Sequence, residues 1–341
     1  MAHDAILWER LGPADMRVRC NLCSHRCVIL PGKQGACCVR ENRDGSLFTL
    51  VYGRAISQHI DPIEKKPLFH FQPGSRSYSV ATVGCNFRCT FCQNWEISQM
   101  PREQHEITGN RAAPAQIAQA ARRAGCASIS YTYTEPTIFA EYALDTAREA
   151  QELGLKNVFV SNGYMTPELI ALMTGLIDAI NVDLKAGRGE FYRRLSGAGL
   201  EPVLANLKLL QRAGVWLEVT TLVIPGLNDS DEELRWAAAW LFQELGPDVP
   251  WHISRFYPQY KMTDVPPTPA ATLERAWQIG RDSGLRYVYI GNLTGHRAES
   301  TFCPQCSALV IERFGYQVRV RGMQAAACAR CGATIAGVEM P

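Results

Sequence analysis

The chain has 341 residues, of which 47% are hydrophobic, and a formal net charge of +2. This length supports a large core, and the near-neutral charge without blocks of like sign gives no indication of nucleic-acid binding. No apolar run is long enough to cross a bilayer and the first residues include charges, so we expect a cytoplasmic protein with no membrane partner.

Residues 1–76 are predicted to form a cysteine-rich extension. Its candidate metal ligands are Cys20, Cys23, Cys27 and Cys37, and Cys38 is an adjacent alternative to the last of these. A cytosolic chain keeps few disulfides, so clustered cysteines favour a metal site. Zinc is the first expectation and an auxiliary 4Fe-4S cluster is the alternative. The charged segment 61–67 is expected to be solvated or to cover the site.

Residues 77–295 alternate between apolar strand patterns and amphipathic helix patterns. We predict strands at 77–83, 128–133, 157–163, 179–186, 216–226, 250–257 and 285–292. We predict helices at 114–125, 137–154, 167–176, 201–214, 230–246 and 271–284. This alternation predicts an α/β fold with parallel strands and right-handed crossovers, either a complete or partial TIM-like (β/α) barrel or a flat doubly wound sheet. Either fold places the active site at the carboxyl ends of the strands.

Residues whose side chains can bind a metal or a cofactor lie at or just after the ends of successive predicted strands. They are Cys85 after the first strand, Glu135 after the second, Ser161 and Asn162 after the third, and Asp183 and Lys185 at the fourth. A single polar residue at a strand end is often only a cap. Several strand ends that meet at one edge of a sheet favour a shared site.

The first strand leads into "GCNFRCTFCQNW", which contains Cys85, Cys89 and Cys92. A closed zinc site uses four protein ligands, and so does a 4Fe-4S cluster that only transfers electrons. Three thiolates leave one iron of such a cluster without a protein ligand, and that position can bind a substrate or cosubstrate. Neighbouring aromatic residues would shield the cluster from water.

Residues 296–341 are predicted to form a small C-terminal metal-binding domain. Its four cysteines are Cys303, Cys306, Cys328 and Cys331, in two C-x2-C pairs. These pairs look like the knuckles of a rubredoxin or zinc ribbon, in which four thiolates bind one zinc or one iron. A domain of this size needs such a metal to fold, so structural zinc is favoured over an electron-relaying iron.

The segment "CNFRCTFC" resembles the cluster motif of the radical S-adenosylmethionine (SAM) superfamily. The resemblance implies that the cluster binds SAM, and that one electron cleaves SAM to a 5'-deoxyadenosyl radical that removes hydrogen from a substrate. It also implies the SAM contacts. "YTYTEP" resembles the element that binds the amino group, through Glu135, and "VSNGY" the element that reaches the ribose or methionine, through Ser161 and Asn162.

The segment "NVDLKA" resembles the Asp-Leu-Lys element of glycyl-radical-enzyme activases, in which Asp183 would meet the SAM ammonium and Lys185 its carboxylate. His252 is a further candidate for SAM binding and is otherwise expected to be a core histidine. Across nearly the whole chain the sequence resembles the radical enzyme of the AmmeMemoRadiSam system, which is related to pyruvate-formate-lyase activating enzyme. In that family Cys37 rather than Cys38 would be the ligand.

The resemblance implies a protein or peptide substrate, with Memo-like or Ammecr-like proteins as neighbours. We also expect an electron donor such as flavodoxin or ferredoxin. Two alternatives stay open. The enzyme could act on a small molecule, or the chain could be a non-catalytic metal-binding or electron-transfer scaffold. The scaffold would explain the outer cysteines but not three thiolates at a strand end beside Glu135, Asp183 and Lys185.

Overall fold

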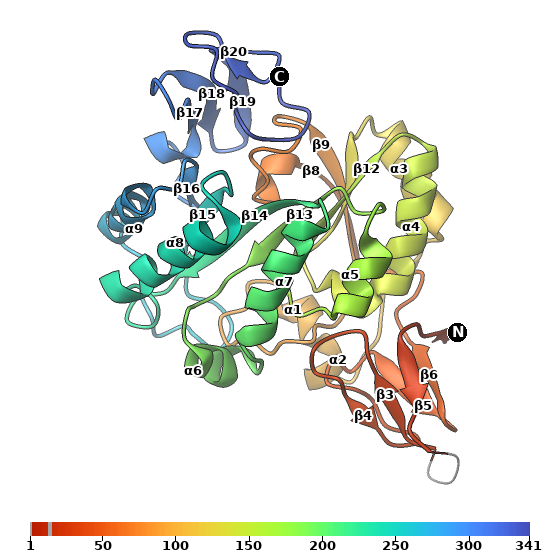
Figure 1. The fold of residues 1–341 in the computed structure, drawn as a ribbon. Coiled ribbons are helices and arrows are strands. Elements are labelled where there is room, and N and C mark those ends of the chain that lie inside the picture. Colours follow the sequence, from red (N-terminus) through yellow and green to blue (C-terminus); the bar gives the residue numbers. More distant parts are fainter. Residues whose placement is uncertain (1, 13–15) are drawn as a thin grey trace.

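The computed structural model describes residues 2–12 and 16–341 and contains one large central sheet (Figure 1). Eight strands pair in the order β16-β15-β14-β13-β12-β11-β9-β8. Neighbouring strands are parallel except for the antiparallel edge pair of β8 and β9. The bounds are β8 Ser57–Pro62, β9 Arg76–Ala81, β11 Ser128–Tyr131, β12 Lys156–Ser161, β13 Ala179–Asp183, β14 Trp216–Val223, β15 Trp251–Arg255 and β16 Val288–Gly291. The sheet is open between β16 and β8, so the predicted α/β fold is confirmed as a partial barrel.

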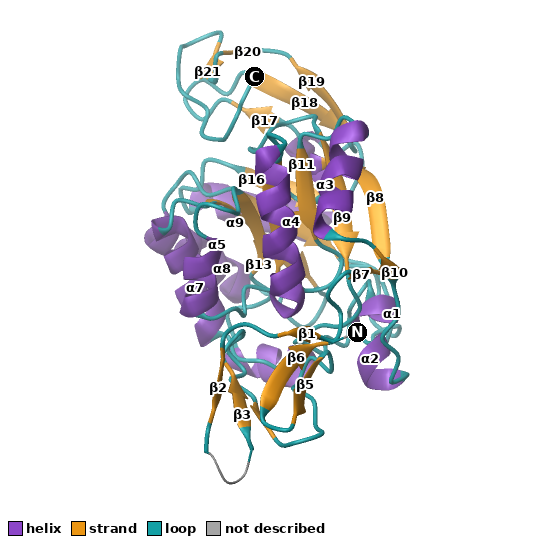
Figure 2. Ribbon diagram, turned by 90° about the vertical axis from the view of Figure 1, so that its right-hand side faces the viewer, coloured by secondary structure: helices purple, strands orange, loops and turns teal. Residues whose placement is uncertain are grey.

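The predicted helices lie between successive strands and cover the outside of the sheet (Figure 2). Local signals fix their starts. Pro167 opens α5, whose first turn is capped by the Thr166 hydroxyl, and the Ser230 hydroxyl caps α8. The longer helices are α3 Pro114–Arg123, α4 Ala140–Glu152, α5 Pro167–Met173, α7 Glu201–Arg212, α8 Asp231–Leu245 and α9 Ala270–Asp282. Among the described residues, none of the helices has the length and apolar character required to span a membrane.

Several short helical segments lie in the connections between strands. Three are α-helical: α1 Trp95–Ser98, α2 Met100–Glu103 and α6 Gly189–Phe191. The others are η1 Ile63–Lys65, η2 Pro136–Phe139, η3 Tyr192–Ser196 and η4 Arg297–Glu299. Of these, α1 and α2 directly follow the three-cysteine segment, so that segment runs from the end of β9 into a short helical turn.

Residues 2–12 and 16–49, here called the N-terminal module, form two small antiparallel sheets. Their strands are β1 His3–Asp4, β2 Trp8–Arg10, β3 Val18–Cys20, β4 Val28–Ile29, β5 Arg40–Arg43 and β6 Ser46–Thr49. A further pair joins β7 Arg54–Ala55 to β10 Asn110–Arg111. The module contacts the loop after β12. There Cys23 forms an isolated antiparallel β-bridge with Met165, and the Thr166 hydroxyl donates to the Asn21 carbonyl at 2.8 Å. It therefore packs at the carboxyl ends of the strands.

Residues 301–341, here called the C-terminal ribbon, lie at the opposite end of the molecule from the N-terminal module (Figure 1). The ribbon strands are β17 Thr301–Phe302, β18 Leu309–Phe314, β19 Gln317–Val320, β20 Met323–Gln324 and β21 Ala327–Cys328. The ribbon packs on the segment after β8. The main chains of Phe71 and Val338 form an isolated parallel β-bridge, and the buried Arg313 guanidinium donates to the Phe69 carbonyl at 2.7 Å. This contact closes the amino end of the barrel.

His70 links the ribbon to the barrel and should make this contact depend on pH. Its ring nitrogens lie 2.5 Å from the Ala336 carbonyl and 2.6 Å from the Tyr289 hydroxyl. Burial lowers the pKa of His70 to about 4. An unfolded chain would protonate this imidazole from about pH 6.5 downward, so folding stability should fall as the pH drops from about 6.5 toward 4.

We therefore expect His70 to make the free energy of unfolding about 2 kcal/mol lower at pH 5 than at pH 7.5. Urea unfolding followed by tryptophan fluorescence at both pH values measures the difference. His70→Gln should reduce the pH dependence by that amount whatever its effect at pH 7.5, whereas the exposed His59→Gln should leave it unchanged. Equal pH dependence in wild type and His70→Gln would contradict the prediction.

Candidate active site

The three-cysteine segment leaves β9 at the carboxyl end of the sheet and is held by main-chain bonds to another loop. The Arg88 amide donates to the Ser196 carbonyl and the Thr90 amide to the Leu195 carbonyl, both at 2.9 Å. These bonds fix the segment between Cys85 and Cys92 against the residues that follow α6. Phe87 and Phe91 are buried beside the cysteines, as their expected shielding role requires.

The three thiols lie close enough to influence one another. Burial, followed by the Glu135 carboxylate and the Cys89 thiol, raises the pKa of Cys85. Burial raises the pKa of Cys89 to about 11, although the Lys185 ammonium acts in the opposite direction. Burial also raises the pKa of Cys92, whose sulfur lies 3.2 Å from the Ser98 hydroxyl. Thiols buried in this way become thiolates most readily when they bind a metal.

Glu135 lies at the centre of a buried hydrogen-bond network after β11. Its Oε1 accepts from the Ser161 hydroxyl at 2.8 Å and from the amide and hydroxyl of Thr137, and its Oε2 accepts from the Asn162 amide at 2.8 Å. The Asn162 side chain donates in turn to Asn86, next to Cys85. Burial raises the pKa of Glu135. The structure thus brings together Glu135, Ser161, Asn162 and Cys85.

Asp183 and Lys185 form a second polar group on the same side of the sheet. The Lys185 Nζ lies 2.8 Å from Asp183 Oδ2 and 5.8 Å from the centre of the Phe91 ring. Burial opposes the charge of Lys185, but Asp183 and then the Cys89 thiol outweigh burial and raise its pKa. The lysine is therefore a fixed cation beside the three-cysteine segment, and the carboxylate next to it is partly exposed.

His252 does not join this group. It is the second residue of β15 and therefore lies at the amino end of the strand, toward the C-terminal ribbon. Its Nε2 lies 2.6 Å from Glu218 Oε2, and its ring stacks on Tyr289 and meets the edge of Phe69. The expected contact with SAM is not supported by this placement, because β15 carries the histidine to the end of the barrel opposite the cysteines.

The charged segment 61–67 is not a solvated face. Asp61 and Lys66 are buried and form an ion pair of 2.7 Å, and the Ser79 and Tyr133 hydroxyls donate to the same carboxylate. Tyr133 has a φ of 63°, a left-handed conformation that residues other than glycine seldom adopt. The sequence analysis did not place these residues together. The only available signal was the density of charges before an apolar strand.

The C-terminal ribbon gathers its four cysteines into one compact group. Cys303 and Cys331 lie 3.6 Å apart, as do Cys306 and Cys328, and all four sulfurs lie within 4.8 Å of one another. Four thiolates around one zinc at about 2.3 Å lie about 3.8 Å apart in a tetrahedron. The geometry fits a single tetrahedral metal, as predicted, and zinc and iron fit it alike.

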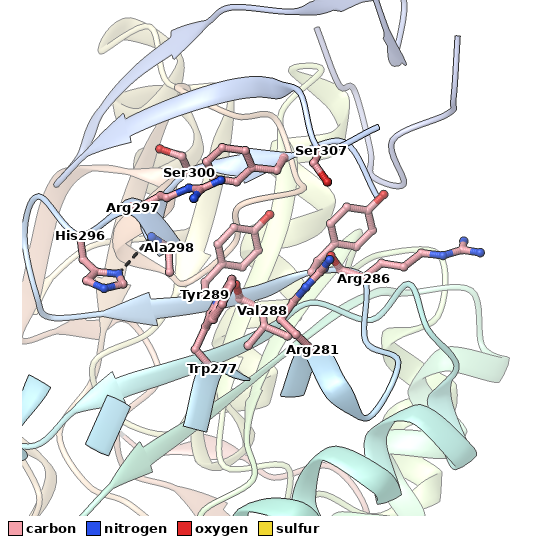
Figure 3. Close-up of a pocket in the computed structure, with 12 residues that line it drawn as sticks. Trp277, Arg281, Arg286, Val288, Tyr289, His296, Arg297, Ala298, Ser300 and Ser307 are labelled. Carbon is pink, nitrogen blue, oxygen red and sulfur yellow. Dashed lines mark hydrogen bonds between the residues drawn. The ribbon is translucent and has the colours of Figure 1, made fainter. Parts of the chain in front are cut away.

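A cavity of about 320 Å³ lies between α9, β16 and the ribbon (Figure 3). Trp277, Tyr287 and Tyr289 line it together with three arginines. The arginines already have partners: Arg286 pairs with Asp248, Arg281 donates to main-chain carbonyls, and Arg297 lies 4.7 Å from the centre of the Phe302 ring. None of the cysteines or expected SAM contacts lines this cavity, so it is separate from the candidate active site.

Comparison with known proteins places the chain in a family. The model of the "Radical SAM superfamily" matches residues 79–236. The uncharacterized protein MJ0808 of Methanocaldococcus jannaschii is 45% identical over 334 residues, which cover 97% of this chain and 98% of the relative. A GTP 3',8-cyclase of Rhodobacter capsulatus is 26% identical over 256 residues, covering 66% of this chain and 72% of the cyclase.

A solved radical SAM methyltransferase from Sphaerobacter thermophilus has the same fold, with a TM-score of 0.50 at 17% identity, over 69% of this chain and 71% of that protein. The fold, the three-cysteine segment and the matched residues define one class, and the chain belongs to the radical SAM superfamily. It is a radical SAM enzyme, and the cofactors of this family are a 4Fe-4S cluster and SAM.

Proposed function

We propose that this protein cleaves SAM reductively and uses the resulting 5'-deoxyadenosyl radical to abstract hydrogen from a protein or peptide substrate. The bound cluster would supply one electron to the SAM sulfonium. The observation that carries the proposal is the convergence of three buried thiols, the Glu135 network and the Asp183–Lys185 pair at the carboxyl end of one sheet.

The chain's own residues would bind and orient SAM. Cys85, Cys89 and Cys92 would hold the cluster, and the Glu135 carboxylate suits the SAM ammonium. Lys185 suits the SAM carboxylate, because Asp183 and the nearby thiols keep its charge in place. The buried Phe87 and Phe91 would exclude water from the radical.

Two features support a large substrate. The sheet stays open between β16 and β8, and a barrel left open in this way favours a large substrate. The Asp183–Lys185 pair also resembles the element of activases that act on proteins. A small-molecule substrate is the second candidate, favoured by the similarity to a GTP 3',8-cyclase across two thirds of this chain.

Isotope transfer would distinguish the two substrates. The enzyme is incubated anaerobically with dithionite, SAM and uniformly deuterated candidate proteins, beginning with Memo-like and Ammecr-like neighbours, and 5'-deoxyadenosine is analysed by mass spectrometry. Deuterium in the product is expected with one of these proteins. Deuterium transferred only from GTP or another small molecule would overturn the protein-substrate proposal and favour the second candidate.

Replacing Lys185 should weaken SAM binding. A hydrogen bond to a charged group contributes about 1.5–3 kcal/mol, so Lys185→Ala should raise the Kd for SAM roughly 10- to 100-fold. Calorimetry on the anaerobically reconstituted protein measures the Kd, with sulfide analysis to verify equal cluster content. Lys208→Ala, at a half-exposed lysine on α7, should bind SAM normally. An unchanged Kd in Lys185→Ala would remove this residue from the SAM site.

A further inference from the structure

The cysteines of the N-terminal module surround a cavity of their own. Cys20, Cys23, Cys27 and Cys37 all line it, together with Arg40. They come from the end of β3, the loop to β4 and the turn before β5.

The spacing of these sulfurs differs from that in the C-terminal ribbon. Among all described histidines, cysteines and acidic residues, only the ribbon cysteines place three or more ligand atoms within 4.8 Å of one another. One metal ion requires that compact arrangement, because every thiolate binds the same atom. In a 4Fe-4S cluster each thiolate binds a different iron, so the sulfurs lie farther apart around a central space.

The same molecule supplies a reference for the wider arrangement. Cys85, Cys89 and Cys92 belong to the segment in which this family binds a 4Fe-4S cluster, and they too lack the compact spacing. The N-terminal four therefore resemble the cluster-binding segment, and differ from the single-metal ribbon, in lacking that compact spacing. All four cysteines nevertheless line one shared cavity, whose remaining lining is mostly apolar and includes Leu22 and Ile29.

The lining of the cavity suits an anionic group. Arg40 is 1% exposed, and its Nη1 pairs with Glu141 at 2.8 Å, yet its Nε has no hydrogen-bond partner in the described part of the chain. The Ala36 amide points at Cys27 and donates to its sulfur at 3.4 Å. A buried cation and an amide donor near the sulfurs stabilise the negative charge that four thiolates bring to a cluster.

We propose that Cys20, Cys23, Cys27 and Cys37 bind a second 4Fe-4S cluster, ligated by four cysteines, in the N-terminal module. Cys38 is not a ligand, because it does not line the cavity and its thiol lies 3.9 Å from the Ala36 carbonyl. The N-terminal cysteines lie beside the three-cysteine segment. A Cβ added to Gly84, next to Cys85, would come within 3.4 Å of the Cys37 carbonyl and 2.8 Å of the Val39 side chain.

Acid-labile sulfide tests the proposal, since single-metal sites contain none. The full chain with Cys85, Cys89 and Cys92 all replaced by alanine is purified and reconstituted anaerobically. We expect it to retain about four sulfides per chain, with the Mössbauer signature of a 4Fe-4S cluster in addition to that of any single iron in the ribbon. A sulfide-free triple variant that instead binds two single metal ions would overturn the proposal.

Variants of the otherwise intact enzyme give an independent measurement. Replacing both Cys23 and Cys37 by alanine leaves two thiolates and should lower the sulfide content from about eight to about four per chain, and Cys38→Ala should leave it at about eight. About four sulfides in the wild type and in both variants would overturn the proposal even if the triple variant fails to fold. Because sulfide is counted without any substrate, the result is independent of the proposed reaction.

Discussion

Cys89→Ala should abolish the formation of 5'-deoxyadenosine from SAM, down to the level seen without protein. Cys89 is buried at the centre of the three-cysteine segment, between Cys85 and Cys92 and close to Lys185. With only two thiolates left, this segment cannot hold a cluster with one open iron. The measurement is chromatographic detection of 5'-deoxyadenosine after anaerobic incubation with dithionite and SAM.

Cys126→Ala is the matched control. Cys126 is also a buried free cysteine, but it lies before β11 and outside all three cysteine groups. Its replacement should leave cleavage unchanged. Full cleavage by Cys89→Ala would contradict the assignment of the cluster to this segment, whatever the enzyme's substrate proves to be.

Cys328→Ala should remove one metal ion per chain and unfold the C-terminal ribbon. Structural zinc contributes about 10–16 kcal/mol in small zinc-binding peptides, far more than a domain of this size gains from its own core. Metal analysis and limited proteolysis provide the readouts, and cleavage within residues 301–341 is expected. Loss of the ribbon would also uncover Phe69 and His70, which it buries.

The exposed Arg330 lies between two of the ligands and supplies the control. Arg330→Ala should retain the metal and resist proteolysis like the wild type. A Cys328→Ala variant with a full metal content and an intact ribbon would show that the four sulfurs do not form the binding site, despite their separation of 3.6 Å in pairs.

The strands and helices of the barrel could be predicted because each has a local pattern. Strand–helix alternation located every parallel strand of the sheet, and Pro114 and Pro167 marked helix starts. The pairing of β8 with β9 could not be predicted in this way, because β8 has no alternating pattern and gains its place from the antiparallel register between His59 and Ser79. In the N-terminal module the pairing of β1 with β6 likewise joins distant residues, since His3 lies opposite Thr49.

The candidate site was predictable where strand ends determine it. Glu135, Ser161 and Asn162 meet because neighbouring parallel strands end at one edge. His252 is the exception. The strand predicted at 250–257 begins one residue before β15, and a histidine so near the start of a strand lies at the end of the barrel opposite the cysteines.

The contact between the ribbon and the segment after β8 has a consequence for how the chain folds during synthesis. His70 bonds to Ala336, a separation of 266 residues, and Gln72 bonds to Glu339, a separation of 267 residues. Contacts of such long range form late, because a large loop must close first. The amino end of the barrel therefore stays uncovered until the ribosome has released nearly the whole chain and the ribbon has bound its metal. Metal shortage would then leave a barrel with exposed Phe69 and Phe71, a target for chaperones and proteases.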